Sequence, residues 1–247
     1  MDSSLESSPI MEMTESIARQ TSFTLSLARR VGTAHARNSN LVFSPLSIHA
    51  VLGLLAAGSR GETEKQILSV LCSDSADELT FLSSQIVSPL LADGSAAGGP
   101  KLAFANGVWV DASLSLKPSF REVVTSAYKA EAKAVDFRSK ANEAREDVNS
   151  WVHTLTGGLI NELLPTGSVD NNTRLILGNA LYFKGDWDKK FDSSQTIESD
   201  FYLLDGSTVQ APFMTTEDKQ YLTSYDDFKV SGSLQARCEI KGGVLHV

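Results

Sequence analysis

Hydrophobic residues fill nearly every position of the segment TRLILGNALYFKGDW, residues 173–187. If the segment is a strand, three leucines and Phe183 share one face with Asn179, and the opposite face is apolar as well. A strand that is apolar on both faces belongs in the middle of a sheet that is covered on both sides. The pattern therefore predicts a central strand, and it leaves Asn179 as a polar residue that needs partners.

Earlier segments show helical periodicity. Residues 14–31 place their apolar side chains roughly along one stripe, which predicts an amphipathic helix. A short strand is predicted at residues 40–44. Ser44 and Pro45 then provide an N-cap and a proline at the first helical position. The following LSIHAVLGLLAAG is apolar almost all the way round, which is typical of a helix inside a molecule.

The remaining segments mix helices and strands. Helices are predicted in GETEKQILSVL, where Ser59 and Glu62 are spaced as a capping box, at residues 76–92, in KPSFREVVTSAYKA and at residues 142–164. Strands are predicted in KLAFANGVWV, in EAKAVDF, in a hairpin with an Asp-Gly turn in ESDFYLLDGSTVQAPFM, and in KQYLTSYDDFKV. Because these elements do not alternate regularly, the predicted fold class is α+β.

Composition narrows the range of functions. The chain has 247 residues and is 42% hydrophobic, which is enough for a real core. Thirty acidic against 22 basic residues give a net charge of -8, which argues against a nucleic-acid partner. No stretch approaches the length of about 18 apolar residues that a membrane span requires, so no membrane partner is expected. A start without a signal-peptide pattern and two distant cysteines favour a cytoplasmic protein.

Common catalytic motifs are missing from the sequence. There is no GxSxG, HExxH, GxxxxGK[ST] or GxGxxG, and the four histidines show no spacing typical of a metal site. Ser47 and His49 are two residues apart on a predicted helix, so they point to different faces and do not form a nucleophile and base. We expect neither an enzyme nor a bound cofactor or metal.

Four long segments together carry a family resemblance: NLVFSPLSIHAVLGLLAAGSRGETEKQIL, FANGVWVDASLSLKPSF, VNSWVHTLTGGLINELLP and LGNALYFKGDWDKKF. In this order and at these separations they resemble the serpin family of serine protease inhibitors, in its plant form. The resemblance covers roughly residues 12–230 as the N-terminal part of a single serpin domain. Residues 1–11 are then a loose N-terminus, and residues 231–247 form a divergent tail.

The resemblance implies a multi-helix, three-sheet serpin fold that traps serine proteases and, in some members, cysteine proteases. In such proteins the target cuts an exposed reactive-centre loop near the C-terminus. The loop then inserts into the central sheet as an extra strand while still joined to the protease, and relief of strain in the native state drives this change.

The same resemblance assigns conformational roles to particular residues. Ser44, Ser47 and Asn179 match the shutter under the centre of the sheet, and Trp187 matches the tryptophan of the breach, where the loop first enters. Asn149 matches the long helix that crosses the sheet and must shift during insertion. From the residues alone, alternatives stay open: Asn179 can satisfy itself against local backbone, and Trp187 can be a strand-end aromatic packed for stability.

The C-terminal part of the family pattern does not appear. SGSLQARCEIKGGVLHV contains no long run of small residues, so no reactive-centre bond can be placed, and His246 does not match the family's shutter histidine. We therefore expect a truncated serpin, from alternative splicing, intron read-through or an incomplete gene model, that is not inhibitory alone.

Two further expectations follow from this interpretation. The alternative function is a non-inhibitory interaction protein or splice fragment, which associates with itself or with full-length serpins through exposed strand edges. The resemblance also permits action in the extracellular space.

Overall fold

The structure is a computed structural model that describes residues 9–35, 41–185, 190–203, 205–217, 220–226 and 229–233. These residues fall into two compact units, one that extends to Lys184 and one that begins at Gly185, and each is described by itself. No helix in the described ranges is long and apolar enough to span a bilayer.

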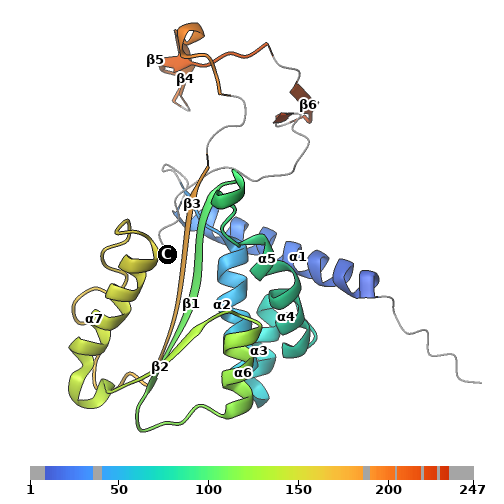
Figure 1. Ribbon diagram of the computed structural model, residues 1–247. Coiled ribbons are helices and arrows are strands. Elements are labelled where there is room, and N and C mark those ends of the chain that lie inside the picture. The colour runs from blue at the N-terminus through green and yellow to red at the C-terminus, as the bar shows by residue number, and fades with distance from the viewer. Residues whose placement is uncertain are drawn as a thin grey trace, which may run out of the picture. The chain divides into compact units, whose positions relative to one another are not determined.

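The first unit is organised around a three-stranded sheet (Figure 1). Its strands are β1 (Lys101–Asp111), β2 (Glu131–Val135) and β3 (Leu175–Lys184), in the order β2-β1-β3. β1 runs parallel to β2 and antiparallel to β3. The register between β1 and β3 places Asn106 opposite Asn179 and Gly107 opposite Gly178. All three strands were expected, and the sheet brings their central residues together.

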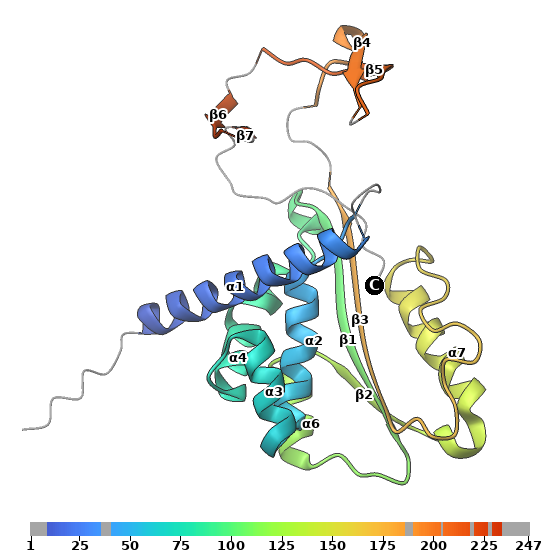
Figure 2. The ribbon, with the colours of Figure 1, turned by 180° about the vertical axis from the view of Figure 1, so that it is seen from behind.

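Helices cover both faces of this sheet, as Figures 1 and 2 show. α7 (Phe137–Leu155) packs on one face, where Trp151 and Val152 meet Trp109 and Ala180. α2 and α6 pack on the other, where Leu54 and Val124 join a cluster with Val108. The helical elements outside α7 are α1 (Pro9–His35), α2 (Pro45–Gly58), α3 (Gly61–Leu71), α4 (Ala76–Leu82), the π-helix η1 (Ser83–Val87), α5 (Ser88–Leu90), the 3₁₀ turn η2 (Ser95–Ala97) and α6 (Pro118–Ser126) in the first unit.

α2 begins as its sequence predicts, whereas its surroundings differ from expectation. Ser44 is the N-cap and its side chain accepts a hydrogen bond from the Ser47 N–H. Residues 41–44 form no strand. The capping box is also wrong, because the Ser59 hydroxyl donates to the Leu55 carbonyl at 2.7 Å and α3 has Arg60, without a side-chain cap, at its N-cap.

The helix expected at residues 142–164 has other bounds. It starts earlier, at Phe137, where the Asp136 carboxylate accepts the Ser139 N–H at 2.9 Å. It ends at Leu155, because Gly157 and Gly158 take positive φ angles of +62° and +82° that a helix cannot contain. Leu159, expected in the packing stripe of this helix, lies beyond it and is 53% exposed.

Two facing glycines make room for Trp109 on the α7 side of the sheet. A Cβ at Gly107 would overlap the Trp109 ring, and a Cβ at Gly178 would lie 2.9 Å from it. The ring meets Trp151 edge to face at 4.9 Å, and its Nε1–H donates to Asp147 Oδ2 at 2.9 Å. Trp109 therefore crosses from β1 toward β3 and is held from above by α7.

β3 is less buried than its apolar sequence predicts. Its residues are mostly half-buried, and Leu175 is 44% exposed. The physical reason is its place in the sheet: within the described ranges β3 has β1 as a neighbour on one side and no strand on the other. Helices cover β3 on both faces as expected, whereas the expected central position, with a strand on each side, is not found within the described ranges.

The second unit contains two separate antiparallel pairs. The 3₁₀ turn η3 (Ser193–Gln195) comes first. β4 (Ile197–Tyr202) and β5 (Thr208–Phe213) then form the predicted hairpin, and β6 (Gln220–Ser224) pairs with β7 (Lys229–Ser233). Gly206 has φ +83°, as the Asp-Gly turn requires. Phe201 and Tyr202 are 50% and 73% exposed, so this hairpin leaves large apolar surface open to solvent.

Adding a methyl group at Gly107 should expose the tight fit at Trp109. Gly107→Ala should lower the free energy of unfolding by about 1–3 kcal/mol, because the new Cβ displaces the ring and its contacts with α7. Urea denaturation followed by circular dichroism measures this change. Gly32→Ala is the control: nothing lies within 4 Å of its added Cβ in α1, so alanine should raise the stability by about 0.5–1 kcal/mol. Equal effects at the two positions would contradict the crowding described at Gly107.

His49 should make the first unit sensitive to acid. Its ring is 3% exposed and packs against Phe23 at 5.3 Å, and this burial lowers the pKa of His49 from 6.5 to about 4 despite the attraction of Glu78. As the pH falls below 6.5, His49 becomes protonated in the unfolded chain but stays neutral in the folded chain. The free energy of unfolding therefore decreases from about pH 6.5 down to about pH 4. Between pH 7.5 and pH 5 the expected loss is about 2 kcal/mol. Urea denaturation at the two pH values should show this loss for the parent chain and a smaller one for His49→Gln.

Candidate functional site

The centre of the sheet holds a line of polar side chains among apolar neighbours. The Asn179 Nδ2 amide donates to Asn106 Oδ1 at 2.8 Å, and the Asn106 Nδ2 amide donates to the backbone carbonyl of Tyr128 at 2.9 Å. Asn106 is 2% exposed and Asn179 is half-buried. The two amides thus connect β3, β1 and the turn between α6 and β2.

α2 completes this line from beneath the sheet. The Ser47 hydroxyl donates to Asn179 Oδ1, and the Ser47 backbone N–H donates to Ser44 Oγ at 3.2 Å. Ser47 is fully buried, and Ser44 is half-buried at the start of the helix. We call the set Ser44, Ser47, Asn106 and Asn179 the polar line.

Each amide of the polar line is oriented by its partners. Because a hydroxyl donates to Asn179 Oδ1, its Nδ2 is directed at Asn106, and the Asn106 amide is directed at the Tyr128 carbonyl in turn. The hydroxyl and amide side chains of the polar line carry no charge at physiological pH, so its function depends on hydrogen bonding rather than on charge.

The arrangement offers no catalytic pair. The Ser47 hydroxyl donates to an amide oxygen, while the His49 ring packs edge-on against Phe23. In the part of the chain that the structure describes, no three His, Cys, Asp or Glu side chains gather as a metal site would require. What the polar line can do is lock α2, β1 and β3 in one relative position.

One of the predicted site residues, Asn149, lies apart from the polar line. Asn149 on α7 binds the segment after that helix: its Oδ1 accepts the N–H groups of Leu163 and Leu164 at 2.9 and 2.8 Å, and its Nδ2 donates to the Leu164 carbonyl at 3.0 Å. Trp187 lies outside the described residues, so its predicted place at the breach stays a prediction. Ser44, Ser47 and Asn179 do come together.

Sequence reasoning did not assign a site role to Asn106, although a signal exists. β1 contains Asn106-Gly107 and β3 contains Gly178-Asn179, the same pair in reverse order. Two antiparallel strands that carry this pair in opposite orders can align asparagine with asparagine and glycine with glycine, and that is the observed register. The reversed pair predicts both the register and the amide contact.

Truncating the two asparagines should have unequal effects. Asn106→Ala leaves the Tyr128 carbonyl and the Asn179 amide without partners in a buried place, and should cost about 2–4 kcal/mol of unfolding free energy. Asn179→Ala should cost less, about 1–2 kcal/mol, because its half-buried site admits water. Urea denaturation compares the two, with the exposed Asn171→Ala as a control that should change little. A larger loss for Asn179→Ala would contradict the order of burial.

Comparison with known proteins identifies the family. A family model described as "Serpin (serine protease inhibitor)" matches residues 18–234. Serpin-ZX from Arabidopsis thaliana is 54% identical over 222 residues, which is 90% of this chain and 57% of the relative. Serpin-Z7 from Hordeum vulgare is 55% identical over 219 residues, covering 87% of this chain and 55% of the relative.

Solved structures agree with this assignment. The native stressed conformation of the Arabidopsis protein AtSerpin1 matches with a TM-score of 0.79 at 54% identity, and covers 89% of this chain and 56% of that one. Emu ovalbumin shares the fold with a TM-score of 0.71 at 24% identity, covering 89% of this chain and 63% of that one. The chain thus spans a little over half the length of these plant relatives. The family match and the plant relatives show that the chain belongs to the serpin family.

Proposed function

We propose that this chain contributes the loop-accepting half of the central sheet to a serine protease inhibitor of the serpin type. The observation that carries the proposal is the open edge of β3 with the polar line at its centre. In the described ranges, β3 pairs with β1 along its length and with no strand on its other side. A long unpaired edge of this kind accepts an extended segment by backbone hydrogen bonding.

Strand geometry specifies which groups face the open edge. The Asp111 N–H donates to the Arg174 carbonyl at 3.0 Å, so this opposed pair is hydrogen-bonded. Bonded and non-bonded pairs alternate in an antiparallel ladder, so even-numbered residues of β3 bond to β1. The backbone N–H and C=O groups that face outward then belong to the odd-numbered residues, which are Leu175, Leu177, Asn179, Leu181 and Phe183.

The polar line has a definite place in this proposal. Asn179 has its backbone directed at the open edge, while its side chain is held by Ser47 and Asn106. A strand that enters beside β3 would have to move β3 and β1 relative to α2. This movement requires the hydrogen bond between the Ser47 hydroxyl and Asn179 Oδ1 to break. We assign Ser44, Ser47 and Asn179 to the shutter, as the family resemblance implies, and we add Asn106.

The remaining roles follow the same reasoning. Asn149 fastens the segment after α7 to that helix, so the helix and the segment should shift as one piece when a strand enters. Trp187 is proposed as the breach residue on its sequence match alone. The expected partners are serine proteases and, by the family resemblance, some cysteine proteases, and the protein traps them rather than catalysing a reaction.

The reactive-centre bond is not assigned to any of these 247 residues. The tail, residues 231–247, contains no long run of small residues leading to a cleavage site. The proposal is therefore that the chain is inhibitory when the missing C-terminal strands and loop are supplied, and not by itself.

A covalent-complex assay tests this proposal. The 247-residue chain and a version continued with the unmatched C-terminal part of Arabidopsis Serpin-ZX are each incubated with a trypsin-like and a chymotrypsin-like protease. An SDS-resistant complex is expected from the continued chain, and cleavage without a complex from the shorter one. If the continued chain is only cleaved, or if the shorter chain forms the complex, the proposal is wrong.

A second candidate function rests on the same open edge. A chain that exposes unpaired strand backbone and large apolar residues such as Phe201 and Tyr202 is suited to pairing with another chain, either a second copy or a full-length serpin. Size-exclusion chromatography of the purified chain, alone and mixed with full-length Serpin-ZX, separates these outcomes. A monodisperse monomer that does not shift on mixing would contradict this candidate.

A further inference from the structure

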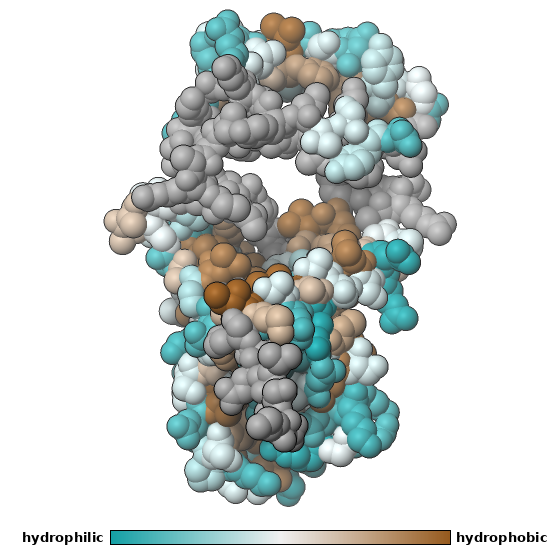
Figure 3. Space-filling model, turned by 90° about the vertical axis from the view of Figure 1, so that its right-hand side faces the viewer, coloured by the Kyte–Doolittle hydropathy of each residue, from teal (hydrophilic) through white to brown (hydrophobic). Residues whose placement is uncertain are grey.

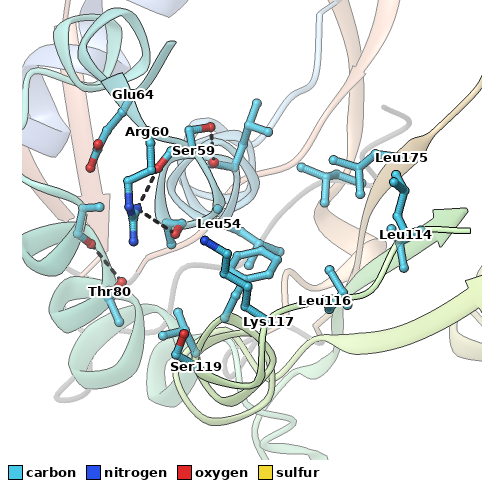
Figure 4. A pocket seen from close by; sticks show the side chains of 18 of the residues that line it. Leu54, Ser59, Arg60, Glu64, Thr80, Leu114, Leu116, Lys117, Ser119 and Leu175 are labelled. Carbon is cyan, nitrogen blue, oxygen red and sulfur yellow. Dashed lines mark hydrogen bonds between the residues drawn. The ribbon is translucent and has the colours of Figure 1, made fainter. Parts of the chain in front are cut away.

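A cavity of about 780 Å³ lies within the first unit, away from the polar line and independent of the proposed inhibitory function. Helices contribute the end of α2 and the first turns of α3, α4 and α6 to its walls. The segment between β1 and α6, the start of β3 and the residue before β3 complete them. The volume is within the range of about 300–1,000 Å³ typical of small-molecule sites. Figure 4 shows its side chains at close range.

One side of the cavity is apolar. Leu54 and Phe120 line it from α2 and α6, and Leu114, Leu116 and Leu175 line it from the segment after β1 and from β3 (Figure 4). Leu114 and Leu175 are 48% and 44% exposed, so apolar surface stays open to solvent inside a concave space. Exposed apolar surface in a concavity favours an apolar ligand over bulk water.

The lining of the cavity carries an excess of positive charge. Arg60, Lys117 and Arg174 line it, against the acidic Glu64 and Asp77. The Arg60 guanidinium is held in place by donating to the Ser59 carbonyl at 2.6 Å, and the Lys117 side chain extends toward the side on which Arg60 lies (Figure 4).

Lys117 is the cation best placed to receive a ligand. Among the ion pairs of the described residues, none involves Lys117. The first turn of α6, which Lys117 precedes, contains no acidic residue that would neutralise it. An anionic group here would thus gain a charge-assisted hydrogen bond without first displacing a carboxylate.

We propose that this cavity binds a fatty carboxylate, with the alkyl chain along Leu116, Phe120 and Leu175 and the carboxylate between Arg60 and Lys117. The combination of apolar and cationic lining residues selects this occupant. A neutral apolar molecule would make no ionic contact with Lys117, and a small hydrophilic anion would leave the leucines in contact with water. Hydrophobic side chains also lie among hydrophilic ones on the face that Figure 3 shows. Ile10 and Met11 of α1 are further exposed apolar residues, but they do not line this cavity.

Calorimetric titration of the 247-residue chain tests the assignment, with sodium dodecanoate below its micellar concentration and dodecanol as the uncharged analogue. Saturable binding of one dodecanoate is expected, with dodecanol weaker by about tenfold because it lacks the charge. Lys117→Gln should weaken dodecanoate about tenfold and leave dodecanol unchanged. Lys101→Gln, an equal change of charge on an exposed lysine at the start of β1, should have no effect.

A second variant separates the apolar part of the site. Ser119 is an exposed residue that lines the cavity, so Ser119→Trp should fill it and abolish binding of both ligands while the far-ultraviolet circular dichroism stays that of the parent. Undiminished binding to Ser119→Trp, or equal affinity for dodecanol and dodecanoate, would overturn the proposal. So would loss of dodecanoate binding when the unmatched C-terminal part of Serpin-ZX is joined to the chain, because the cavity would then be the seat of that segment.

Discussion

The structure depends on the need of two amides at the centre of the sheet, one buried and one half-buried, for partners. Asn106 and Asn179 face each other from neighbouring strands in an interior that contains little other polar surface, and an unpaired buried amide costs about 1–3 kcal/mol. Each amide is satisfied only when β1, β3, α2 and the turn at Tyr128 are all in place. The polar line therefore makes one sheet register and one helix position much more favourable than their alternatives, which hydrophobic packing alone does not do.

The two faces of the sheet are built on different principles. Beneath it, hydrogen bonds connect α2 to the strands, and these are directional and break within a short displacement. Above it, α7 is held by the Trp109 and Trp151 rings and by the Asp147 carboxylate, across a hollow that two glycines keep open. Aromatic contact falls off more gradually with sliding than a hydrogen bond does, so we expect α7 to tolerate small shifts that α2 does not.

Local signals in the sequence predicted much of this fold correctly. The Ser44-Pro45 start of α2, the β1 strand and the Asp-Gly hairpin depend on residues close together in the chain, and all were found where expected. The incorrect predictions concern residues that could form two different local structures, or elements whose environment depends on distant parts of the chain. Gly157 and Gly158 ended α7 earlier than its hydrophobic stripe indicated, and Ser59 bonded back into α2 instead of capping α3. The exposure of β3 depends on which strands lie beside it, and no property of its own residues could show that.

The candidate site shows the same division. Ser44, Ser47 and Asn179 were predicted through the family resemblance, and the structure brings them together. Asn106 was seen only as part of an alternating strand, because its role appears when β1 and β3 are aligned. Asn149 was predicted to lie on the helix that shifts during insertion, and in the structure its amide binds the segment at Leu164, which the sequence did not indicate.

The facing Asn-Gly and Gly-Asn pairs also limit how the gene can vary. Inserting or deleting a single codon within β1 or β3 rotates every following side chain to the opposite face of the sheet. An asparagine would then meet the tryptophans under α7, and the glycine hollow would open toward Ser47. A substitution in either strand changes the contacts of one side chain, whereas a change of length disrupts both faces at once.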